Sequence, residues 1–586
     1  MRANRETIKR LTPHICGTWI LSALLWLLWP ILDSAFVADD IPNSQRSAGL
    51  RAAQETLIDF TFRLTRQWMK NEGRFFPVSV FENALIFHTI HSRFLYKLLE
   101  LLAAATLVLC LAVFVQLITR NWKAALLTVT TFCVALQVRF WYDPTISFGI
   151  LLPSVGTKAL VALCLIVIGI RSKKTWITMC TFGSATVLWS LALMQYEIVL
   201  LLASIAVLIA LHEVQYSIKK RLTGVLAIVT PSIVFLGISR IIRHGVVASP
   251  AYAANTELST VGRALKYQLL GGVPLSVPMS GVDDRVGLWE STQSLNMLQI
   301  AFICITIIAI GYLLLSIEKL QVRTRFTMFA CGVALFVLPA IPTSLSVRWQ
   351  SELGPGHAYL PVMLQYLGTS LLLLVAMTEI IYAVRLLKLR NDHMIQPVVL
   401  LLVFIISTLS VMTIHTNRAG IVFTNNSYMG FRIDREIFEA GIRRDMLDTS
   451  LSEGVLISAT YDPALWVNTD YVSWLGGPKI STFGRAQALI TCRVSGAKEC
   501  QMSNGGLFFI ERVRTKETTS AFVILKSWWI SPQSVEDLTA VGTIAKKRTD
   551  LMCGQAGATY SSGWWIGECS LIDEVMFQKI KAQYAP

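Results

Sequence analysis

The sequence predicts a polytopic α-helical membrane protein with an α+β domain at its C-terminal end. Of its 586 residues, 54% are hydrophobic and only 15% are charged, whereas soluble domains carry about 25% charged residues. Apolar runs long enough to cross a bilayer recur through residues 1–415. Apolar content falls and turn residues become frequent in residues 416–586. These three observations separate a transmembrane domain from a second, water-exposed domain.

About eleven helices are expected to cross the membrane. The first is not expected to be a cleaved signal peptide, because no small-residue cleavage site follows it. The expected spans are 14–32, 94–118, 122–141, 150–170, 175–195, 197–213, 222–241, 297–317, 324–345, 358–384 and 396–415.

The distribution of Lys and Arg predicts that the N-terminus is cytoplasmic and the C-terminus outside. Arg2, Arg5, Lys9 and Arg10 precede the first span, and the short loops expected on the same side are basic. The short loops expected outside hold one basic residue, Arg348. This asymmetry follows the positive-inside rule. It assigns the net charge of +15 to membrane orientation rather than to nucleic-acid binding.

Two adjacent carboxylates, Asp39 and Asp40, follow the first span and open a long outer loop, residues 33–93. One of them is a candidate general base that takes the proton from an acceptor hydroxyl. The alternative is a helix N-cap or a pair of solvated loop charges. The cytoplasmic loops are short and contain no nucleotide-binding pattern. Chemistry is therefore expected on the outer face, with a lipid-borne donor.

The same loop contains an amphipathic helix over residues 51–70. Leu57, Phe60, Leu64 and Trp68 fall on one helical face. This helix is expected to lie flat in the membrane interface or to pack on the protein's own outer surface. Both arrangements form a roof beside the acidic pair.

Three further residues are candidate substrate ligands. Asp143 follows span three, where it could bind a substrate hydroxyl or start a turn with the following proline. Glu197 opens span six, and an ionisable group there indicates a site unless it reaches the interface or pairs with an arginine. Tyr359 lies in the outer loop 346–361.

Cations of the outer loops are candidates for binding a phosphate leaving group. Arginine offers paired donors to phosphate, and Arg348 is preferred because it is the only basic residue of the short outer loops. His357 in the same loop could bind phosphate or donate a proton, although a lone loop histidine is more often only solvated. Lys266 and Arg285 belong to the middle outer loop, residues 242–296.

The middle loop also offers a second acidic pair, Asp283 and Asp284, as an alternative catalytic site. A stretch before it, "VGRALKYQLLGG", is a second candidate interfacial helix.

Residues 416–586 are expected to form a soluble α+β domain outside the cytoplasm. "GVLISAT", "GLFFIERV" and "AFVILKSWWI" predict strands, and "DREIFEAGIRRDML" predicts a helix. The domain contains four cysteines, an even number that favours two disulfides in an oxidising compartment. Sequential pairing, Cys492–Cys500 and Cys553–Cys569, is preferred among the three connectivities that four cysteines allow.

Residues 1–415 resemble the GT-C superfamily of integral-membrane glycosyltransferases. The resemblance rests on the basic N-terminus, one span, and an outer loop that opens with "DDIPNSQ" and continues into an amphipathic helix. "YDP" after span three and "YE" at span six look like motifs of bacterial members. Those members include the glucosyltransferases that decorate O-antigen and related mannosyl- and arabinosyltransferases.

The resemblance implies a polyprenyl-phosphate-linked sugar donor and a glycan or glycolipid acceptor of the cell envelope, such as lipopolysaccharide. It places the reaction on the outer face of a bacterial inner membrane. It makes Asp39 or Asp40 the base of a single inverting displacement, with polyprenyl phosphate leaving toward Arg348 or a nearby cation. Some members use a divalent cation such as Mg²⁺ or Mn²⁺ at the acidic loop, and the adjacent Asp-Asp pair leaves this open.

Two other classes of function compete with this one. An O-antigen-type polymerase or ligase would also act outside, but it typically relies on Arg and His in a large loop between late spans. A transporter is expected to carry charges or broken helices at mid-membrane depth, often in two related halves. A scaffold without catalysis would leave the three outer regions unexplained.

Overall fold

The computed structural model describes residues 2–443 apart from 45, 47–49, 51–53, 91, 140–142, 149, 245, 247–252, 281–296 and 387–394. Beyond residue 443 it describes six strands. The chain forms two compact units. The first comprises Met1–Ser34, Leu57–Ile86 and Ile90–Asn425, and the second comprises Ala35–Thr56, Phe87–Thr89 and Asn426–Pro586.

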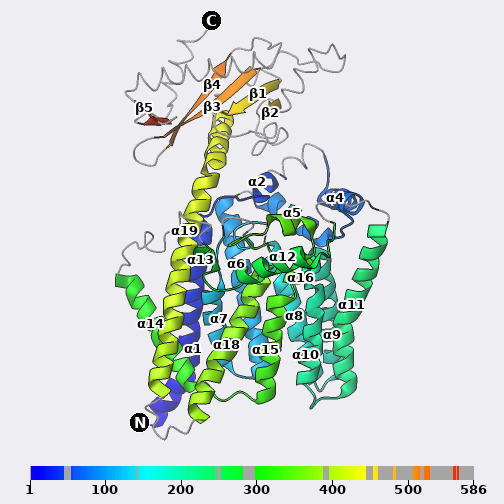
Figure 1. Ribbon diagram of the computed structural model, residues 1–586, viewed down its shortest axis with the longest axis vertical. Coiled ribbons are helices and arrows are strands. Elements are labelled where there is room, and N and C mark those ends of the chain that lie inside the picture. The colour runs from blue at the N-terminus through cyan, green and yellow to red at the C-terminus, as the bar shows by residue number, and fades with distance from the viewer. Residues whose placement is uncertain are drawn as a thin grey trace. The chain divides into compact units, whose positions relative to one another are not determined.

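The first unit is a bundle of apolar helices (Figure 1). Among the described residues, eight helices are long and apolar enough to cross a membrane, and three shorter apolar helices accompany them. They coincide with the stretches expected to be spans, and the chain is a multi-pass membrane protein. In chain order, the helices described are α1 (Arg2–Leu28), η1 (Trp29–Asp33), α2 (Asp40–Asn43), α4 (Leu57–Glu72), α5 (Pro77–Thr89), α6 (Arg93–Thr119), α7 (Trp122–Ala135), α8 (Leu151–Arg171), α9 (Thr175–Gln195), η2 (Glu197–Ala203), α10 (Ser204–His212), α11 (Ile218–His244), α12 (Leu258–Gly271), α13 (Ser276–Met279), α14 (Met297–Ser316), α15 (Val322–Val337), α16 (Ala340–Ser344), α17 (Val347–Glu352), α18 (Val362–Leu386) and α19 (Ile395–Arg443).

The bundle is built from neighbouring pairs of helices. α8 packs against α9 and α6, α15 packs against α18, and α7 lies between α6 and α18. Trp189 of α9, Phe132 of α7 and Tyr366 of α18 are fully buried in the bundle. Apolar side chains outside the contacts stay exposed, as expected for a surface that faces lipid.

Span three ends earlier than the sequence predicted. The expected span was 122–141, but α7 ends at Ala135, and Leu136 adopts an extended conformation. Its 14 residues extend about 21 Å, less than the ~30 Å hydrocarbon core of a bilayer. Arg139 therefore lies beyond the helix. The expectation that Arg348 is the one arginine of the short outer loops is wrong.

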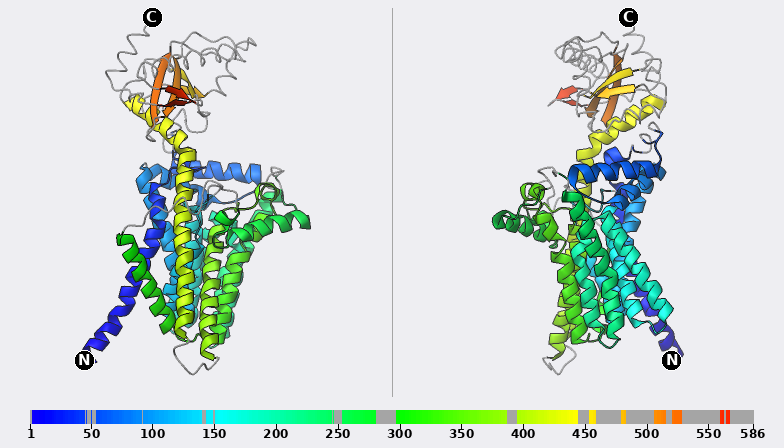
Figure 2. Two further views of the ribbon diagram at one scale, coloured as in Figure 1. Left: turned by 60° about the vertical axis from the view of Figure 1, so that its left-hand side comes forward. Right: turned by 90° about the vertical axis from the view of Figure 1, so that its right-hand side faces the viewer.

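Two helices lie across the direction of the long helices, as Figure 2 shows for α4 and α12. α4 begins at Leu57, later than the expected helix over 51–70. Phe60 on the predicted apolar face is buried, and Leu64 and Trp68 are half-buried. Phe62, off this face, is 72% exposed. The helix thus packs its predicted face on the protein and leaves another apolar side chain available to the interface.

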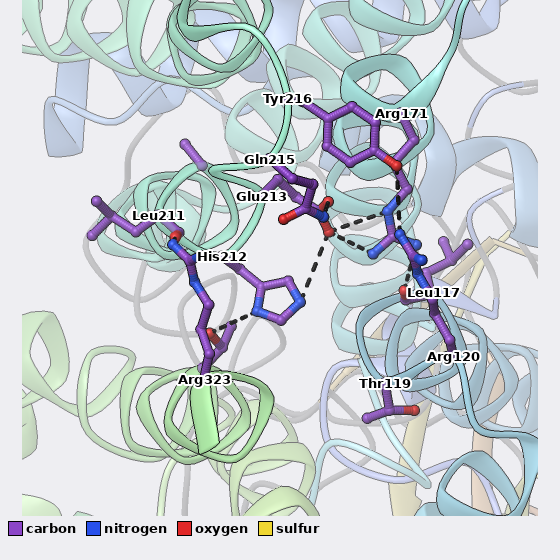
Figure 3. Close-up of polar contacts among 12 residues, drawn as sticks. Leu117, Thr119, Arg120, Arg171, Leu211, His212, Glu213, Gln215, Tyr216 and Arg323 are labelled. Carbon is purple, nitrogen blue, oxygen red and sulfur yellow. Dashed lines mark hydrogen bonds and ion pairs between the residues drawn. The ribbon is translucent and has the colours of Figure 1, made fainter. Parts of the chain in front are cut away.

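Charged side chains connect the helix ends on the side expected to be cytoplasmic through ion pairs and hydrogen bonds (Figure 3). Glu213 is fully buried, and its Oε1 atom accepts hydrogen bonds from Nε and Nη2 of Arg171. Arg171 also donates from Nη1 to the carbonyl oxygen of Leu117 at 2.6 Å. His212 lies 3.8 Å from the same carboxylate, and Gln215 donates to its Oε2 atom at 3.0 Å. The paired Arg171 and Glu213 thus join α6, α8 and the end of α10.

The second unit contains the described strands β1 (Glu453–Ser458), β2 (Lys479–Thr482), β3 (Gly506–Arg514), β4 (Ser520–Ser527), β5 (Thr559–Ser561) and β6 (Trp564–Ile566). β1 pairs in parallel with β2 and β3, and β3 pairs with β4 antiparallel, which gives the order β2-β1-β3-β4. β5 and β6 form a separate antiparallel pair. The strands β1, β3 and β4 coincide with the three predicted ones.

Of two further predictions for the C-terminal region, the structure corrects one and does not describe the residues of the other. α19 continues from Ile395 to Arg443, so the helix passes through the boundary expected at residues 415 and 416. Cys492, Cys500, Cys553 and Cys569 lie outside the described residues, and their pairing stays a prediction.

Candidate functional site

A pocket of about 360 Å³ lies where stretches expected on the outer face converge. Its lining comes from the end of α4, the start of η2, the end of α11, the first part of the middle loop, α16 and α17. The lining residues are Glu72, Gly73, Arg74, Tyr196, Glu197, Ile198, Arg243, Val246, Ala253, Ala254, Pro342, Thr343, Leu345, Ser346, Trp349 and Tyr359. Two predicted substrate ligands, Glu197 and Tyr359, are therefore brought together from distant parts of the chain.

One wall of the pocket is a short antiparallel pairing between the middle loop and the α16–α17 junction. Ala254 and Ser346 form an isolated β-bridge. The backbone N–H of Val347 donates to the carbonyl oxygen of Ala253 at 3.1 Å. The side chain of Gln350 donates to the carbonyl oxygen of Asn255 at 2.9 Å. These bonds satisfy loop backbone groups and hold this wall in place.

Glu197 is paired with a cation inside the pocket. Arg74 Nη2 donates to Glu197 Oε1 at 2.6 Å. The guanidinium also lies 4.7 Å from the centre of the Phe76 ring and 5.9 Å from that of Tyr196. Burial lowers the pKa of Arg74, but Glu197 and the neighbouring tyrosines raise it, and the balance lies above the ordinary value. Glu197 is thus paired with an arginine of the protein, and its part in substrate binding stays a prediction.

Aromatic side chains also line the pocket. Trp349 stacks on Tyr359 with ring centres 3.6 Å apart and planes 26° apart. Tyr196 hydrogen-bonds to Tyr359. Burial raises the pKa of Tyr196 well above its ordinary value, and Tyr359 raises it further. The Tyr196 phenol therefore stays protonated and available as a hydrogen-bonding group at neutral pH.

A glycine positions the second arginine of the pocket. Gly73 has φ 62°, in the left-handed region that favours glycine. A Cβ atom there would lie 3.0 Å from Cγ of Arg243. Arg243 Nε donates to the carbonyl oxygen of Gly73 at 3.4 Å. Within the described part of the chain, Arg243 makes no ion pair, so its charge is not neutralised by a carboxylate there.

Gly73→Ala is expected to lower the free energy of unfolding by about 1–2 kcal/mol, because a Cβ atom is disfavoured in the left-handed region and would push Arg243 aside. Gly237→Ala in α11 is the matched control, since a Cβ atom there meets nothing within 4 Å. The measurement is the unfolding free energy of both purified variants in detergent. Equal effects of the two substitutions would contradict the assignment.

The predicted phosphate-binding cations lie outside the lining of this pocket. Arg348 Nε donates to Glu352 Oε1 at 2.8 Å, and its guanidinium lies 4.7 Å from the Trp349 ring. His357 is half-buried in the loop after α17, and Lys266 is exposed on α12. Arg285, like Asp283 and Asp284, falls outside the described residues. Arg348 is thus engaged by a carboxylate four residues later in the chain.

Asp143 is buried in the segment after α7. Its Oδ2 atom accepts from the backbone N–H of Arg139 at 2.6 Å, and its Oδ1 atom accepts from those of Thr145 at 2.7 Å and Ile146 at 3.1 Å. Burial raises the pKa of Asp143, whereas these hydrogen bonds lower it, and burial prevails. Both carboxylate oxygens serve the turn that carries them, and substrate binding by Asp143 stays a prediction.

The same segment contains an arginine that the sequence reasoning missed. Arg139 is 2% exposed. Its guanidinium donates to the Tyr366 hydroxyl at 3.1 Å, to the Gly356 carbonyl oxygen at 2.7 Å and to the Gly271 carbonyl oxygen. It therefore ties α12, the loop before α18 and α18 together. The available signal was an arginine at the end of an apolar run.

A buried ion pair in α6 contacts the same segment after α7. Lys97 Nζ donates to Glu100 Oε2 at 2.9 Å and to the carbonyl oxygen of Ile146 at 2.7 Å. Both charged side chains are almost fully buried in α6. Charges in such a place are costly unless they are paired, and here they hold the segment that contains Asp143.

The acidic pair belongs to the second compact unit, whereas the pocket belongs to the first. Asp40 is fully buried and begins α2, while Asp39 is exposed. The backbone N–H of Asp40 donates to Val37 at 3.1 Å, and the carbonyl oxygen of Asp39 accepts from Asn43 at 3.1 Å. The two carboxylates that the sequence left equivalent are distinguished by burial.

The residues that the structure describes contain no group of three or more His, Cys, Asp or Glu side chains arranged to hold a metal ion. Use of a divalent cation at the acidic pair therefore stays as open as the sequence left it.

No protein-family model matches the chain, and no curated protein sequence matches it. Among solved structures, ArnT from Cupriavidus metallidurans bound to undecaprenyl phosphate is 13% identical, with a TM-score of 0.36 over 84% of this chain and 92% of that one. Its apo state gives the same values. The apo oligosaccharyltransferase from Archaeoglobus fulgidus is 11% identical, with a TM-score of 0.35 over 88% of this chain and 75% of that one. Likenesses at this level assign no function to this chain.

Proposed function

We propose that this chain is an inverting glycosyltransferase of the GT-C type. It moves a sugar from a polyprenyl-phosphate-linked donor to a glycan or glycolipid of the cell envelope. The reaction takes place on the extracytoplasmic face of a bacterial inner membrane. The proposal rests above all on the acidic pair directly after the first span, in which Asp40 is fully buried and Asp39 is exposed.

Asp40 is the general base in this proposal. A base must be held at a fixed position near the proton that it takes, and an environment with little water strengthens such an interaction. Asp40 meets both conditions, because it is buried and its backbone is hydrogen-bonded into α2. Asp39, which is exposed, is the second choice. Asp283 and Asp284 remain the alternative pair.

The reaction is a single displacement. The base takes the proton of the acceptor hydroxyl while that oxygen forms a bond to the anomeric carbon of the donor sugar. The bond between the anomeric carbon and the phosphate oxygen breaks, and its electron pair leaves with polyprenyl phosphate. Attack on the face opposite the leaving group inverts the anomeric configuration.

The leaving phosphate requires a fixed cation. Arg348, His357, Lys266 and Arg285 remain candidates for this role. Arg243 joins them, since it lines the pocket and has no ion-pair partner in the described ranges. Arg348 would have to exchange Glu352 for the phosphate, whereas Arg243 would only have to give up a 3.4 Å hydrogen bond to a carbonyl oxygen.

The pocket is assigned to sugar binding. Its volume of about 360 Å³ falls in the range of small-molecule pockets. Tyr359, which stacks on the buried Trp349, offers an apolar contact, and the paired Glu197 and Arg74 offer hydrogen bonding. This mixture suits a ring with one apolar face and several hydroxyls.

The test uses the purified full chain with a polyprenyl-phosphate-linked hexose or pentose and an envelope-glycan extract as acceptor. The expected product is free polyprenyl phosphate, released only when acceptor is present. A deletion strain is expected to lack one side sugar when its envelope glycan is analysed by mass spectrometry. Shortened glycan chains would identify a polymerase instead, and an unchanged glycan without release of polyprenyl phosphate would favour a transporter or scaffold.

A further inference from the structure

A cluster of three cations and one tyrosine lines a small cavity near the N-terminal end of α15, away from the pocket. Lys319, Arg325 and Arg385 line a small cavity together with Tyr382, where α14 and α18 end and α15 begins (Figure 1). Lys319 Nζ lies 4.2 Å from the centre of the Tyr382 ring, and Cζ of Arg325 lies 4.7 Å from it. Like charges gathered in this way create a positive potential that attracts anions.

Nearby acidic and carbonyl groups satisfy the cluster only in part. Glu379 pairs with Nη1 of Arg325, and Glu318 lines the cavity with an exposed side chain. Arg385 donates to the carbonyl oxygens of Ile317 at 2.9 Å and Leu315 at 3.1 Å, which carry no net charge. Three cations thus face two carboxylates, and the cluster keeps a positive excess.

One donor of the cluster has no acceptor among the described residues. Arg325 Nε is buried, and the described residues supply no hydrogen-bond partner for it. Buried donors are nearly always satisfied, because leaving one unpaired costs stability. The cavity, about 10 Å³ in volume, has room for about one water-sized group. A single oxygen atom of an anion fits this space, with the rest of the anion at its mouth.

The surroundings indicate that the anion is part of a lipid. Leu315, Ile380 and Leu386 flank the cluster with large exposed apolar side chains, 46%, 43% and 57% exposed. Ile380 and Leu386 belong to α18, which is long and apolar enough to cross a membrane, and Leu315 belongs to the end of the shorter apolar helix α14. Apolar side chains on one side and cations on the other match an acyl chain joined to a charged headgroup.

We propose that Lys319, Arg325 and Arg385 bind the phosphate of an anionic phospholipid. The positive-inside pattern places this lipid in the cytoplasmic leaflet. The site has no part in sugar transfer, and it does not depend on that proposal. The cluster around Glu213 differs, because a fully buried carboxylate there takes Arg171 (Figure 3).

The experiment compares lipid binding by three forms of the full chain. Native mass spectrometry of detergent-purified protein is recorded with added dioleoyl phosphatidylglycerol or dioleoyl phosphatidylcholine. Lys319→Gln/Arg385→Gln is expected to bind phosphatidylglycerol about 25-fold more weakly than the natural chain, at about fivefold for each charge removed. Lys173→Gln/Lys174→Gln, which removes two exposed lysines of another basic loop, is expected to leave that affinity within about twofold.

Lys319→Gln alone keeps the test decisive if the double variant does not fold, with an expected loss of about fivefold. The proposal is overturned if phosphatidylcholine binds the natural chain as tightly as phosphatidylglycerol. It is also overturned if both double variants lose affinity equally. Displacement of phosphatidylglycerol by millimolar inorganic phosphate would assign the cluster to a soluble anion instead.

Discussion

Asp40→Asn is expected to lower the rate of sugar transfer by about 10²–10⁴-fold, the range typical of a lost general base. Asparagine keeps the shape of the side chain but cannot accept the proton of the acceptor hydroxyl. Asp40 is fully buried, so water replaces its role poorly. The measurement is release of polyprenyl phosphate by purified protein at saturating donor. The thermal unfolding midpoint of the variant should stay close to that of the natural chain.

Two matched variants show whether a loss of transfer rate in Asp40→Asn identifies Asp40 as the base. Asp39→Asn is expected to reduce the rate less than tenfold, because Asp39 is exposed. Asp33→Asn, at another exposed aspartate of the same region, is expected to leave it unchanged. A large loss in Asp39→Asn with none in Asp40→Asn would move the base to Asp39. Full turnover in both would move it to Asp283 or Asp284.

Arg171→Gln is expected to lower the free energy of unfolding by about 3–5 kcal/mol, the usual effect of removing one partner of a buried ion pair. Glu213, which is fully buried, would lose the guanidinium that now bonds its Oε1 atom. The measurement is reversible denaturation of the purified protein in mixed micelles, followed by circular dichroism. Lys173→Gln removes an exposed charge two residues away and is expected to change the free energy by less than about 0.5 kcal/mol.

A double variant separates charge from packing at the same place. Arg171→Met/Glu213→Leu removes both charges together, and such replacements of buried pairs are often neutral or stabilising. The double variant is therefore expected to recover most of the stability lost by Arg171→Gln. Destabilisation as large as in the single variant would show that hydrogen bonds to Leu117 and Gln215, rather than charge balance, hold this cluster together.

The sequence by itself determined the membrane class, the placement of the helices and three of the strands. These follow from apolar run length, helical periodicity and alternation, which act over short stretches of chain. It also indicated α4 and α12 as helices outside the bundle, because each is amphipathic. Its error at span three had a local cause, since "QVRFW" reads as an apolar run until Arg139 is seen to need buried acceptors.

Only the tertiary structure decided which polar groups meet. Arg74 and Glu197 are 123 positions apart, and Arg139 reaches carbonyl oxygens at Gly271 and Gly356. Pairings of this kind depend on how helices pack, and spacing along the chain does not encode them. For the same reason Asp39 and Asp40 are equivalent in the sequence, yet one is exposed and the other buried. Burial is a property of the packed surroundings, and it is what distinguishes a candidate base from a solvated charge.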